Sequence, residues 1–537
     1  MTCGGAFIGP TTELCNGIDD DCNGAADDSP APPSSTPSSC ADTAGVCAGR
    51  TPTCGGAAGW GCSFPAEYQA TEVLCDTLDN DCDGTPDEGC LVVGPASDRR
   101  LDGGDTVGAE NSTAPTISGN AAAGVYAAWM DLRGTGGAHI YFNRSTDGGD
   151  AWGAAATRLD TASGAAIGPQ LAVTGASRQN ITAVWADFRG GTSYREVFTA
   201  RSTNSGASFG TDGRENPGQN TDSFNIDVAV SGSNVYAVYE NFVTVRSRHI
   251  FLVASTDHGA TFGAPVRVDN GAGATFVAST PVVAAAGTNV YVAWRDNRNG
   301  GGDIYGNRST NDGATFAGAD TRLDVGTGAG ASASFAPTIA AEGGNVYVAW
   351  VDDRLGGSFD IWLNLSRDSG ATWLTSDSVR IDADSLPHDS VSPQIVTSGA
   401  GRAVIAWVDF RFGFPDVLVS RSIDSGSTFS SPVRADTGTG PGTSASLEVS
   451  LAAEGDLVAV GWTDNRDGAY DIYGNFSLDG GASFQPQDYR LDDTVIPGSS
   501  DSISPQIYVG GGVVHAVWVD YRDSATGNGD IYYRRLR

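Results

Sequence analysis

Two short acidic stretches near the start of the chain carry the residues best suited to bind a metal ion. In DNDCDGTPDE (79–88) carboxylates stand at alternate positions and a glycine follows them, and DDDCNGAADD (19–28) repeats this arrangement. Alternating carboxylates can converge on one hard cation, and the glycine permits a sharp turn, as at the start of a calcium loop. The predicted ligands are Asp19, Asp21, Asn23, Asp27, Asp28, Asp79, Asp81, Asp83, Asp87 and Glu88.

The chemistry of these ligands favours calcium. The longer segments ELCNGIDDDCNGAADD (13–28) and VLCDTLDNDCDGTPDEGC (73–90) resemble metal-binding repeats of large secreted bacterial proteins, and they are similar to thrombospondin type 3 calcium repeats. The resemblance implies a bound metal, which is copper in some relatives. The first 90 residues contain no histidine, and hard oxygen ligands favour Ca²⁺. The alternative is a pair of acidic, disulfide-bonded turns without an ion; no organic cofactor is predicted.

The cysteines indicate an oxidising compartment. All ten lie in the first 90 residues, without a recognisable zinc spacing, and this pattern is typical of disulfides in a region whose core is small. The alternative is a reduced metal–thiolate cluster, and the pairing cannot be deduced from the sequence. The cysteines are Cys3, Cys15, Cys22, Cys40, Cys47, Cys54, Cys62, Cys75, Cys82 and Cys90.

Net charge and hydropathy exclude several classes of partner. The formal net charge is −33 and the pI is near 4.2, which argues against nucleic acid and anionic membranes because both require a basic face. No apolar run approaches the roughly 18 residues needed to span a bilayer. The opening MTCGGAF matches PTCGGAA (52–58) and lacks a signal-peptide pattern. We therefore expect a trimmed fragment of a longer secreted precursor, located outside the cell or at its surface.

From about residue 93 the sequence is repetitive. An apolar cluster ending in Trp or Tyr recurs about every 55 residues, and a repeat of this length with several short strand patterns predicts a β-propeller. In the fifth unit the predicted strands are 336–341, 345–354, 359–366 and 376–383. The markers of the eight units are Trp129, Trp185, Tyr239, Trp294, Trp350, Trp407, Trp462 and Trp518.

The two ends of the repetitive region predict how the ring closes. The eighth unit stops at Arg537 after its third strand, whereas GPASDRRLDGG (94–104) matches the fourth strands GADTRLD (318–324) and QDYRLD (487–492) of other units. The N-terminal segment should therefore supply the missing strand and remove the exposed sheet edges. We predict an all-β, eight-bladed propeller of four-stranded blades, with seven blades as the alternative.

A polar turn recurs seven times in this region. SRDSGATW (366–373) has near-copies that all follow the pattern Ser-x-Asp/Asn-x-Gly-x-(Thr/Ser/Ala)-Trp/Phe. The turn resembles the Asp-box, or bacterial neuraminidase repeat, which implies a hairpin between the third and fourth strands, on the face opposite a substrate site. Its polar side chain can accept hydrogen bonds from turn N–H groups and its glycine supplies a positive φ. The predicted structural residues are Asp147, Asn204, Asp257, Asn311, Asp368, Asp424 and Asp479.

Sialidases resemble this chain in the recurring turn alone. Sialidases also need three arginines that grip a carboxylate, a tyrosine nucleophile activated by a glutamate, an aspartate acid/base and usually an Arg-Ile-Pro motif, which this chain lacks. The arginines lie mostly in a repeated W-x-D-x-R element, as in Asp352/Arg354. An acid often opens the third strand, as in Asp360. We interpret this arginine and this acid as scaffold ion pairs that face each other across the intervening loop; the alternative is that they contact a ligand.

The third unit departs most from the repeat. Tyr239, Asn241 and Val243 replace the usual Trp, Asp and Arg, while His139 and Glu196 replace the acid that opens the third strand in units one and two. If the propeller has one specific site, we expect it on these adjacent units, although ordinary drift of a blade is the alternative. The weak candidates are Glu240, Arg246, Arg248 and His249.

These observations predict four segments and two competing functions. Residues 1–28 and 40–92 are Cys-rich acidic repeats, 29–39 is a Pro/Ser linker, and 93–537 is the propeller. The favoured function is a secreted or cell-surface calcium-binding protein that acts in binding, adhesion or extracellular assembly. Its partner would be a carbohydrate or protein surface, or a second copy of the chain. The alternative is an exo-glycosidase of sialidase type with its site in the irregular loops of blades one to three.

Overall fold

The structure is a computed structural model whose chain divides into two compact units, residues 1–94 and residues 95–536. It describes residues 12–21, 23–30, 44–62, 64, 68, 79, 81–84, 98–104, 106–120, 124–134, 136–161, 164–175, 179–189, 194–217, 221–244, 247–271, 276–376, 378–383, 387–492, 496–523 and 527–536. Among these residues no helix is long and apolar enough to cross a membrane.

The second unit contains eight four-stranded antiparallel sheets, each one blade of a propeller. The first blade is β4 (Ser112–Gly119), β5 (Val125–Asp131), β6 (His139–Ser145) and β7 (Thr157–Arg158). The second is β8 (Ala166–Thr174), β9 (Asn180–Asp187), β10 (Glu196–Ser202) and β11 (Gly213–Arg214). The third is β12 (Ser223–Ser231), β13 (Asn234–Thr244), β14 (Ser247–Ser255) and β15 (Val266–Arg267). The fourth is β16 (Ala278–Ala286), β17 (Asn289–Asp296), β18 (Asp303–Ser309) and β19 (Thr321–Arg322).

The second half of the ring repeats the pattern. The fifth blade is β20 (Ser334–Glu342), β21 (Asn345–Asp352), β22 (Asp360–Ser366) and β23 (Val379–Arg380). The sixth is β24 (Ser390–Thr397), β25 (Ala403–Asp409), β26 (Asp416–Ser422) and β27 (Val433–Arg434). The seventh is β28 (Ser446–Glu454), β29 (Leu457–Asp464), β30 (Asp471–Ser477) and β31 (Tyr489–Arg490). The eighth is β32 (Ser502–Gly510), β33 (Val513–Asp520), β34 (Asp530–Leu536) and β3 (Arg99–Arg100).

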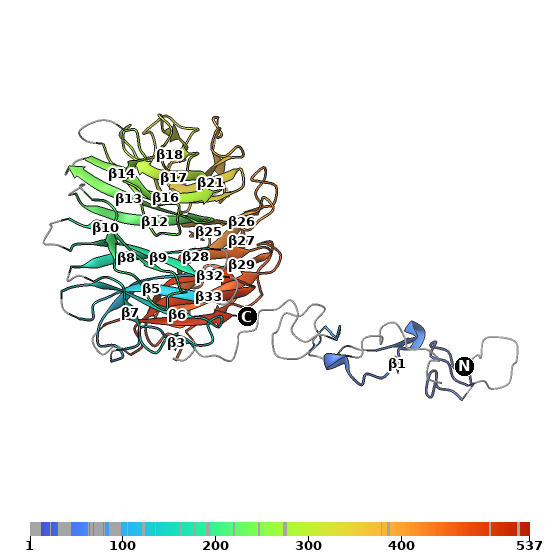
Figure 1. Cartoon of the computed structure of the whole chain (residues 1–537). Coiled ribbons are helices and arrows are strands. Elements are labelled where there is room, and N and C mark those ends of the chain that lie inside the picture. The colour runs from blue at the N-terminus through green and yellow to red at the C-terminus, as the bar shows by residue number, and fades with distance from the viewer. Residues whose placement is uncertain are drawn as a thin grey trace. The chain divides into compact units, whose positions relative to one another are not determined.

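The eighth blade joins the two ends of the propeller sequence. β3 pairs with β34 through Arg99 opposite Tyr533 and Arg100 opposite Tyr532, and Leu101 N donates to the Ile531 carbonyl at 2.7 Å. The red C-terminal strands therefore lie beside the cyan strands of the first blade (Figure 1). The predicted eight blades and closure by the N-terminal strand are confirmed, and the seven-bladed alternative is wrong.

The innermost strand of each blade packs against the innermost strand of the next, from β4 round to β32 and back to β4. Each carries a bulge near its start, such as the register shift between Ile167 and Gln170 in β8 and between Phe224 and Asp227 in β12. The second and third strands are buried on both faces because a neighbouring blade covers each of them. Seven of the marker tryptophans are among the largest fully buried side chains.

The first unit contains little regular structure. Its elements are the short 3-10 helices η2 (Gly45–Cys47) and η3 (Gly56–Ala58) and the hairpin of β1 (Thr53–Cys54) and β2 (Trp60–Gly61). Disulfides join Cys15 to Cys54 and Cys47 to Cys82, and Cys62 is also disulfide-bonded. The predicted Cys-rich, loop-dominated region stapled by disulfides is confirmed for these residues. Cys3, Cys22, Cys40, Cys75 and Cys90 lie outside the described residues.

Candidate binding site and metal loops

The recurring polar turn is held by its own side chains. Ser366 Oγ accepts a hydrogen bond from Gly370 N at 2.8 Å and donates to Asp368 Oδ1 at 2.7 Å. Asp368 also accepts from Thr372 N and Thr372 Oγ1. These bonds lower the pKa of Asp368 to about 2. The same bonds from a serine and a turn N–H reach Asp147, Asn204, Asp257, Asn311, Asp424 and Asp479.

The W-x-D-x-R elements form ion pairs within themselves. Asp352 accepts from Trp350 Nε1 at 3.0 Å and from Arg354 Nη2 at 2.7 Å. Among the described residues of the fifth blade, the pair expected between Arg354 and Asp360 does not form. Asp360, which opens the third strand, instead pairs with Arg380 at 2.6 Å. The reason is the antiparallel register, which brings the two-residue fourth strand alongside the third. The same local pair occurs in Arg133–Asp131, Arg189–Asp187, Arg298–Asp296, Arg411–Asp409, Arg466–Asp464 and Arg522–Asp520.

Two of the four candidates in the irregular third blade meet. Glu240 is fully buried in β13, and its carboxylate accepts from Arg248 Nη1 at 2.8 Å and Asn225 Nδ2 at 3.0 Å. It also accepts at 3.3 Å from the backbone N–H of Thr280 in the fourth blade. Arg246 lies outside the described residues. Glu240 therefore ties two blades together and already has a partner on each side-chain oxygen.

His249 belongs to a separate cluster. Its Nδ1 lies 2.9 Å from Asp269 Oδ2 and its Nε2 lies 3.1 Å from Ser247 Oγ. It follows Arg248 directly in β14, and successive strand residues point to opposite faces of a sheet. His139 makes the matching contact with Asp160 in the first blade, and Glu196 pairs with Arg214 in the second. Of the three described candidates, His249 thus lies apart from Glu240 and Arg248.

A pocket of about 300 Å³ opens between the second and third blades, beside the bulges of β8 and β12. We call it the bulge pocket. Asn225 has a φ of 51° and Gly168, at the equivalent place in β8, has a φ of 61°, so both bulges pass through the left-handed region. The bulge pocket is lined by Ile167, Gly168, Gln170, Ala186, Arg195, Phe224, Asn225 and Ile226.

The polar walls of the bulge pocket are held by charged partners. Arg195 Nε and Nη2 donate to the two oxygens of Asp222 at 2.8 and 2.7 Å, and this pair raises the pKa of Arg195 although burial opposes the rise. The guanidinium also lies 4.8 Å from the ring centre of Phe224. Asn225 is held by Glu240. The sequence pattern singled out Glu240 but missed Arg195 and Asn225. Arg195 directly precedes β10, and Asn225 lies in the bulge of β12.

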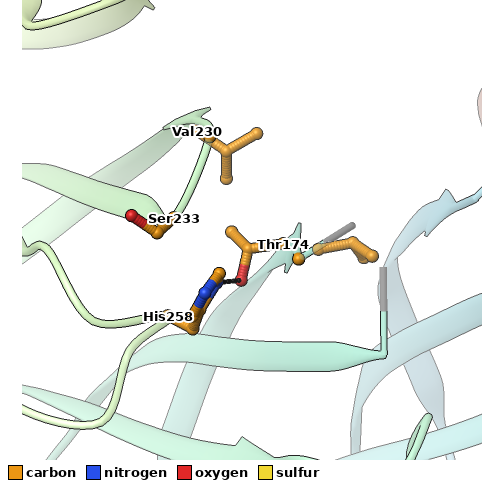
Figure 2. A pocket seen from close by; sticks show the side chains of 7 residues that line it. Thr174, Val230, Ser233 and His258 are labelled. Carbon is orange, nitrogen blue, oxygen red and sulfur yellow. Dashed lines mark hydrogen bonds between the residues drawn. The ribbon is translucent and has the colours of Figure 1, made fainter. Parts of the chain in front are cut away.

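A larger pocket, of about 550 Å³, lies at the opposite ends of β8 and β12. Figure 2 shows His258 pointing from its turn toward Thr174, with Nδ1 3.2 Å from Thr174 Oγ1, while Val230 and Ser233 line another side. His258 occupies the left-handed position of the turn, with a φ of 62°. Its carbonyl accepts a hydrogen bond from Arg201 Nε at 2.7 Å. His258 therefore contributes to the contact between the second and third blades.

The two acidic loops of the first unit share one geometry. Gly24 N donates to Asp19 Oδ2 at 3.0 Å, and Gly84 N donates to Asp79 Oδ2 at 3.0 Å. Carboxylate oxygens of Glu13, Asp19 and Asp21 lie within 4.8 Å of one another, as do those of Asp79, Asp81 and Asp83. Asp87 and Glu88 lie outside the described residues, whereas Asp27 accepts a hydrogen bond from Asn16 N and Asp28 accepts one from Asn23 Nδ2.

The oxygens of the second loop fit a hard cation. Asp79 is 5% exposed, and its Oδ1 is buried without a hydrogen-bond partner among the described residues. An unpaired buried carboxylate oxygen is costly, so a cation at this position would relieve the cost. Glu13, which the sequence reading did not include, lies against Asp19 and Asp21 and binds the Asp21 and Asp27 N–H groups at 2.9 and 3.0 Å.

Comparison with protein families supports a metal-binding motif in this unit. A family model for copper-binding MopE, described as "Putative metal-binding motif", matches residues 10–28 and 69–88. These stretches contain both acidic loops. Comparison with curated proteins finds no match.

Comparison with solved structures finds matches at low sequence identity. A protein of unknown function from Dyadobacter fermentans is 12% identical, with 82% of this chain and 98% of that chain covered and a TM-score of 0.39. A polysaccharide lyase of family PL25, an ulvan lyase, is 10% identical, with coverages of 81% and 95% and a TM-score of 0.44. A Trypanosoma rangeli sialidase is 11% identical, with coverages of 71% and 56% and a TM-score of 0.36. This level of likeness assigns no activity to the chain.

Proposed function

We propose that this protein is a secreted or cell-surface propeller that acts by binding, in adhesion or extracellular assembly, and that its N-terminal loops hold calcium. One observation supports the proposal for the propeller: the polar side chains of the recurring turns and of the W-x-D-x-R elements bond to one another, as in Ser366–Asp368 and Arg354–Asp352. Glu240, one of the weak catalytic candidates, bonds to Arg248, Asn225 and a backbone N–H rather than to a tyrosine or serine nucleophile. We infer that the seven polar turns are Asp-boxes with a structural role.

The choice of calcium rests on ligand chemistry. Each described loop offers carboxylate oxygens, and the first 90 residues contain no histidine. Cys15, Cys47, Cys54 and Cys82 are consumed by disulfides, so they offer no thiolate to a soft metal such as copper(I). A bound Ca²⁺ would supply positive charge that offsets repulsion among the clustered carboxylates. Secretion is supported by the disulfides, which persist in oxidising compartments.

Calcium binding is tested by titrating the full, metal-stripped chain with Ca²⁺ in a calorimeter. We expect saturable binding heat that is reduced in Asp79→Asn, because this change removes the charge of the buried carboxylate that opens the second loop. Asp456→Asn changes a 60% exposed carboxylate of the propeller and should leave the titration unchanged. Equal titrations for both variants, or preferential binding of Cu²⁺ over Ca²⁺ in competition, would contradict the assignment.

Catalysis is tested separately with fluorogenic sialosides and other exo-glycosidase substrates. We expect no turnover above that of a heat-denatured control. Turnover that disappears in Glu240→Gln but persists in Asp456→Asn would support the sialidase-type alternative and overturn the binding proposal. Glu240→Gln keeps the shape of the side chain, so folding of this variant should be checked by its thermal unfolding.

A further inference from the structure

We propose that the bulge pocket binds one pyranose unit of a neutral polysaccharide. The inference rests on the proposed binding function and adds a place and a ligand class to it. The pocket is large enough for a single sugar ring, at about 300 Å³, and it lies at the lower end of the volumes typical of ligand sites. Its walls combine apolar and uncommitted polar groups, which is the chemistry of a polyhydroxylated ring.

The apolar walls suit the C–H face of a pyranose. Ile167 and Ile226 come from the bulges of adjacent blades, and the half-buried Phe224 also lines the pocket. Phe224 is also held in place, because its ring centre lies 5.0 Å from that of Phe242. A fixed aromatic ring gives a large contact area at little entropic cost to binding.

The polar walls retain hydrogen-bonding capacity in both directions. Arg195 uses Nε and Nη2 for Asp222, and Asn225 uses Nδ2 for Glu240. Within the described residues, Arg195 Nη1, Asn225 Oδ1 and the Gln170 amide make no further side-chain bond. Sugar hydroxyls both donate and accept, so an amide oxygen, an amide N–H group and a guanidinium N–H group can be satisfied by the same ring.

The charge around the bulge pocket favours a neutral ligand. Arg195 is balanced by Asp222 and Arg248 by Glu240, so these two pairs carry no net charge. Asp227, next to Ile226 in β12, adds a carboxylate that accepts from Val283 N at 2.8 Å. The whole chain has a net charge of −33, which opposes the approach of polyanions. An acidic sugar would therefore gain little from Arg195.

One substitution in the repeat leaves the space for this pocket. The residue that precedes the W-x-D aspartate or its equivalent is Ala186 in the second blade, where it lines the pocket. All other blades have a larger residue at the same register position: Met130, Glu240, Arg295, Val351, Val408, Thr463 and Val519. Ala186→Met would thus fill the pocket with a side chain that the first blade already accommodates.

The experiment is affinity electrophoresis of the full chain in gels that contain one polysaccharide each. The neutral probes are starch, β-glucan, mannan, galactan and xylan, and the acidic probes are alginate, polygalacturonate and chondroitin sulfate. We expect retardation by at least one neutral probe, weakened about tenfold or more by Ala186→Met and by Gln170→Ala. Gln506→Ala changes the residue at the Gln170 position of the eighth blade and should remain within twofold of the unmodified chain.

Each contrary result has a distinct meaning. Retardation by no probe, by acidic probes only, or by a neutral probe equally in Ala186→Met would overturn the pocket assignment. Release of reducing ends in the same polysaccharide mixtures would instead overturn the non-catalytic function while leaving the bound ligand class intact. Should Ala186→Met unfold, Gln170→Ala decides, because Gln170 makes no side-chain bond with other described residues.

Discussion

At the scale of single residues, a serine at the start of the innermost strand lies between two buried carboxyl groups. Ser446 Oγ is 2.8 Å from Asp436 Oδ2 and 2.9 Å from Asp464 Oδ2. A hydroxyl has one proton to donate, so both contacts are satisfied when one carboxyl is itself protonated. Burial, together with the charge of Asp416, raises the pKa of Asp436 to about 7. Burial resists the ionisation of Asp464, but Arg466 lowers its pKa below the ordinary value.

The raised pKa values predict how stability depends on pH. Asp436 and Asp492 have pKa values of about 7 and Asp324 of about 6, all above the ordinary 3.8. Between about pH 4 and 7 the folded state therefore holds protons that the unfolded state has released. We expect the free energy of unfolding to fall as pH rises through this window, measured by urea unfolding at pH 5, 6, 7 and 8.

The polar turns do not obscure this trend. The pKa of Asp424 is about 2, so its contribution is present above pH 3.8 and is lost only as pH falls toward 2. Asp436→Asn should flatten the pH dependence of the free energy of unfolding between pH 5 and 8, because the amide does not titrate in this range. The position should accept an asparagine, since Asn216 occupies it in the second blade. Asp424→Asn is the matched control and should keep the slope. An unchanged slope in Asp436→Asn would refute the assignment.

At the scale of the element, the polar turn also links neighbouring blades. Arg308 Nη1, at the end of β18, donates at 2.8 Å to the carbonyl of Ser369, in the turn of the next blade. Ser369 has a φ of 58°, so the carbonyl is turned away from ordinary strand pairing. The same kind of link runs from Arg144 to Ser205, from Arg201 to His258, from Arg367 to Ser425, from Arg421 to Asp479 and from Arg535 to Gly148.

Removing one link should cost measurable stability. Hydrogen bonds that involve a charged group contribute about 1.5–3 kcal/mol to stability. Because Arg308 is only half-buried, we expect Arg308→Ala to lower the free energy of unfolding by about 1–2 kcal/mol. Arg402→Ala removes a surface pair with Asp456 and should cost under about 1 kcal/mol. Denaturant unfolding at pH 7 measures both; a smaller loss for Arg308→Ala than for Arg402→Ala would contradict the link.

At the scale of the whole propeller, closure depends on one two-residue strand. β3 is the outer strand of the eighth blade although it lies more than 400 residues from β34 in the chain. Beyond the ladder, Asp102 accepts from Ile531 N at 3.1 Å and from Ser112 Oγ at 2.8 Å. Arg522 also pairs with Asp98 at 2.5 Å. These contacts join the first and last parts of the propeller sequence.

Truncation tests the importance of closure. A chain that begins at residue 95 keeps β3 and should melt in one cooperative thermal transition at the same size as the full chain. A chain that begins at residue 105 lacks β3 and leaves the edge of β34 unpaired, so it should melt at a lower temperature and associate. Light scattering and calorimetry measure both properties. Identical melting and size for the two chains would show that closure adds no stability.

The sequence by itself determined the repeat and the strand that closes the ring, and it favoured eight blades over seven. The signals were the spacing of markers such as Trp350, the recurring turn SRDSGATW, and the match of 94–104 to the fourth strands of other units. These features can be read from the sequence because hydrophobic periodicity and turn chemistry are local properties of the chain. The acidic loops were equally visible as alternating carboxylates. Each of these features repeats, and repetition makes a pattern distinguishable from chance.

The tertiary structure decided which side chains meet. The strand register pairs Asp360 with Arg380 rather than with Arg354. The alternation of side chains along the strand places His249 and Glu240 on opposite faces of the sheet. The disulfide between Cys15 and Cys54 likewise depends on the fold. The bulge pocket was hidden because its walls come from two blades and its key feature is a small residue, Ala186, whose effect is to leave space. Contacts between distant segments depend on packing, and packing is a property of the folded chain rather than of any one segment.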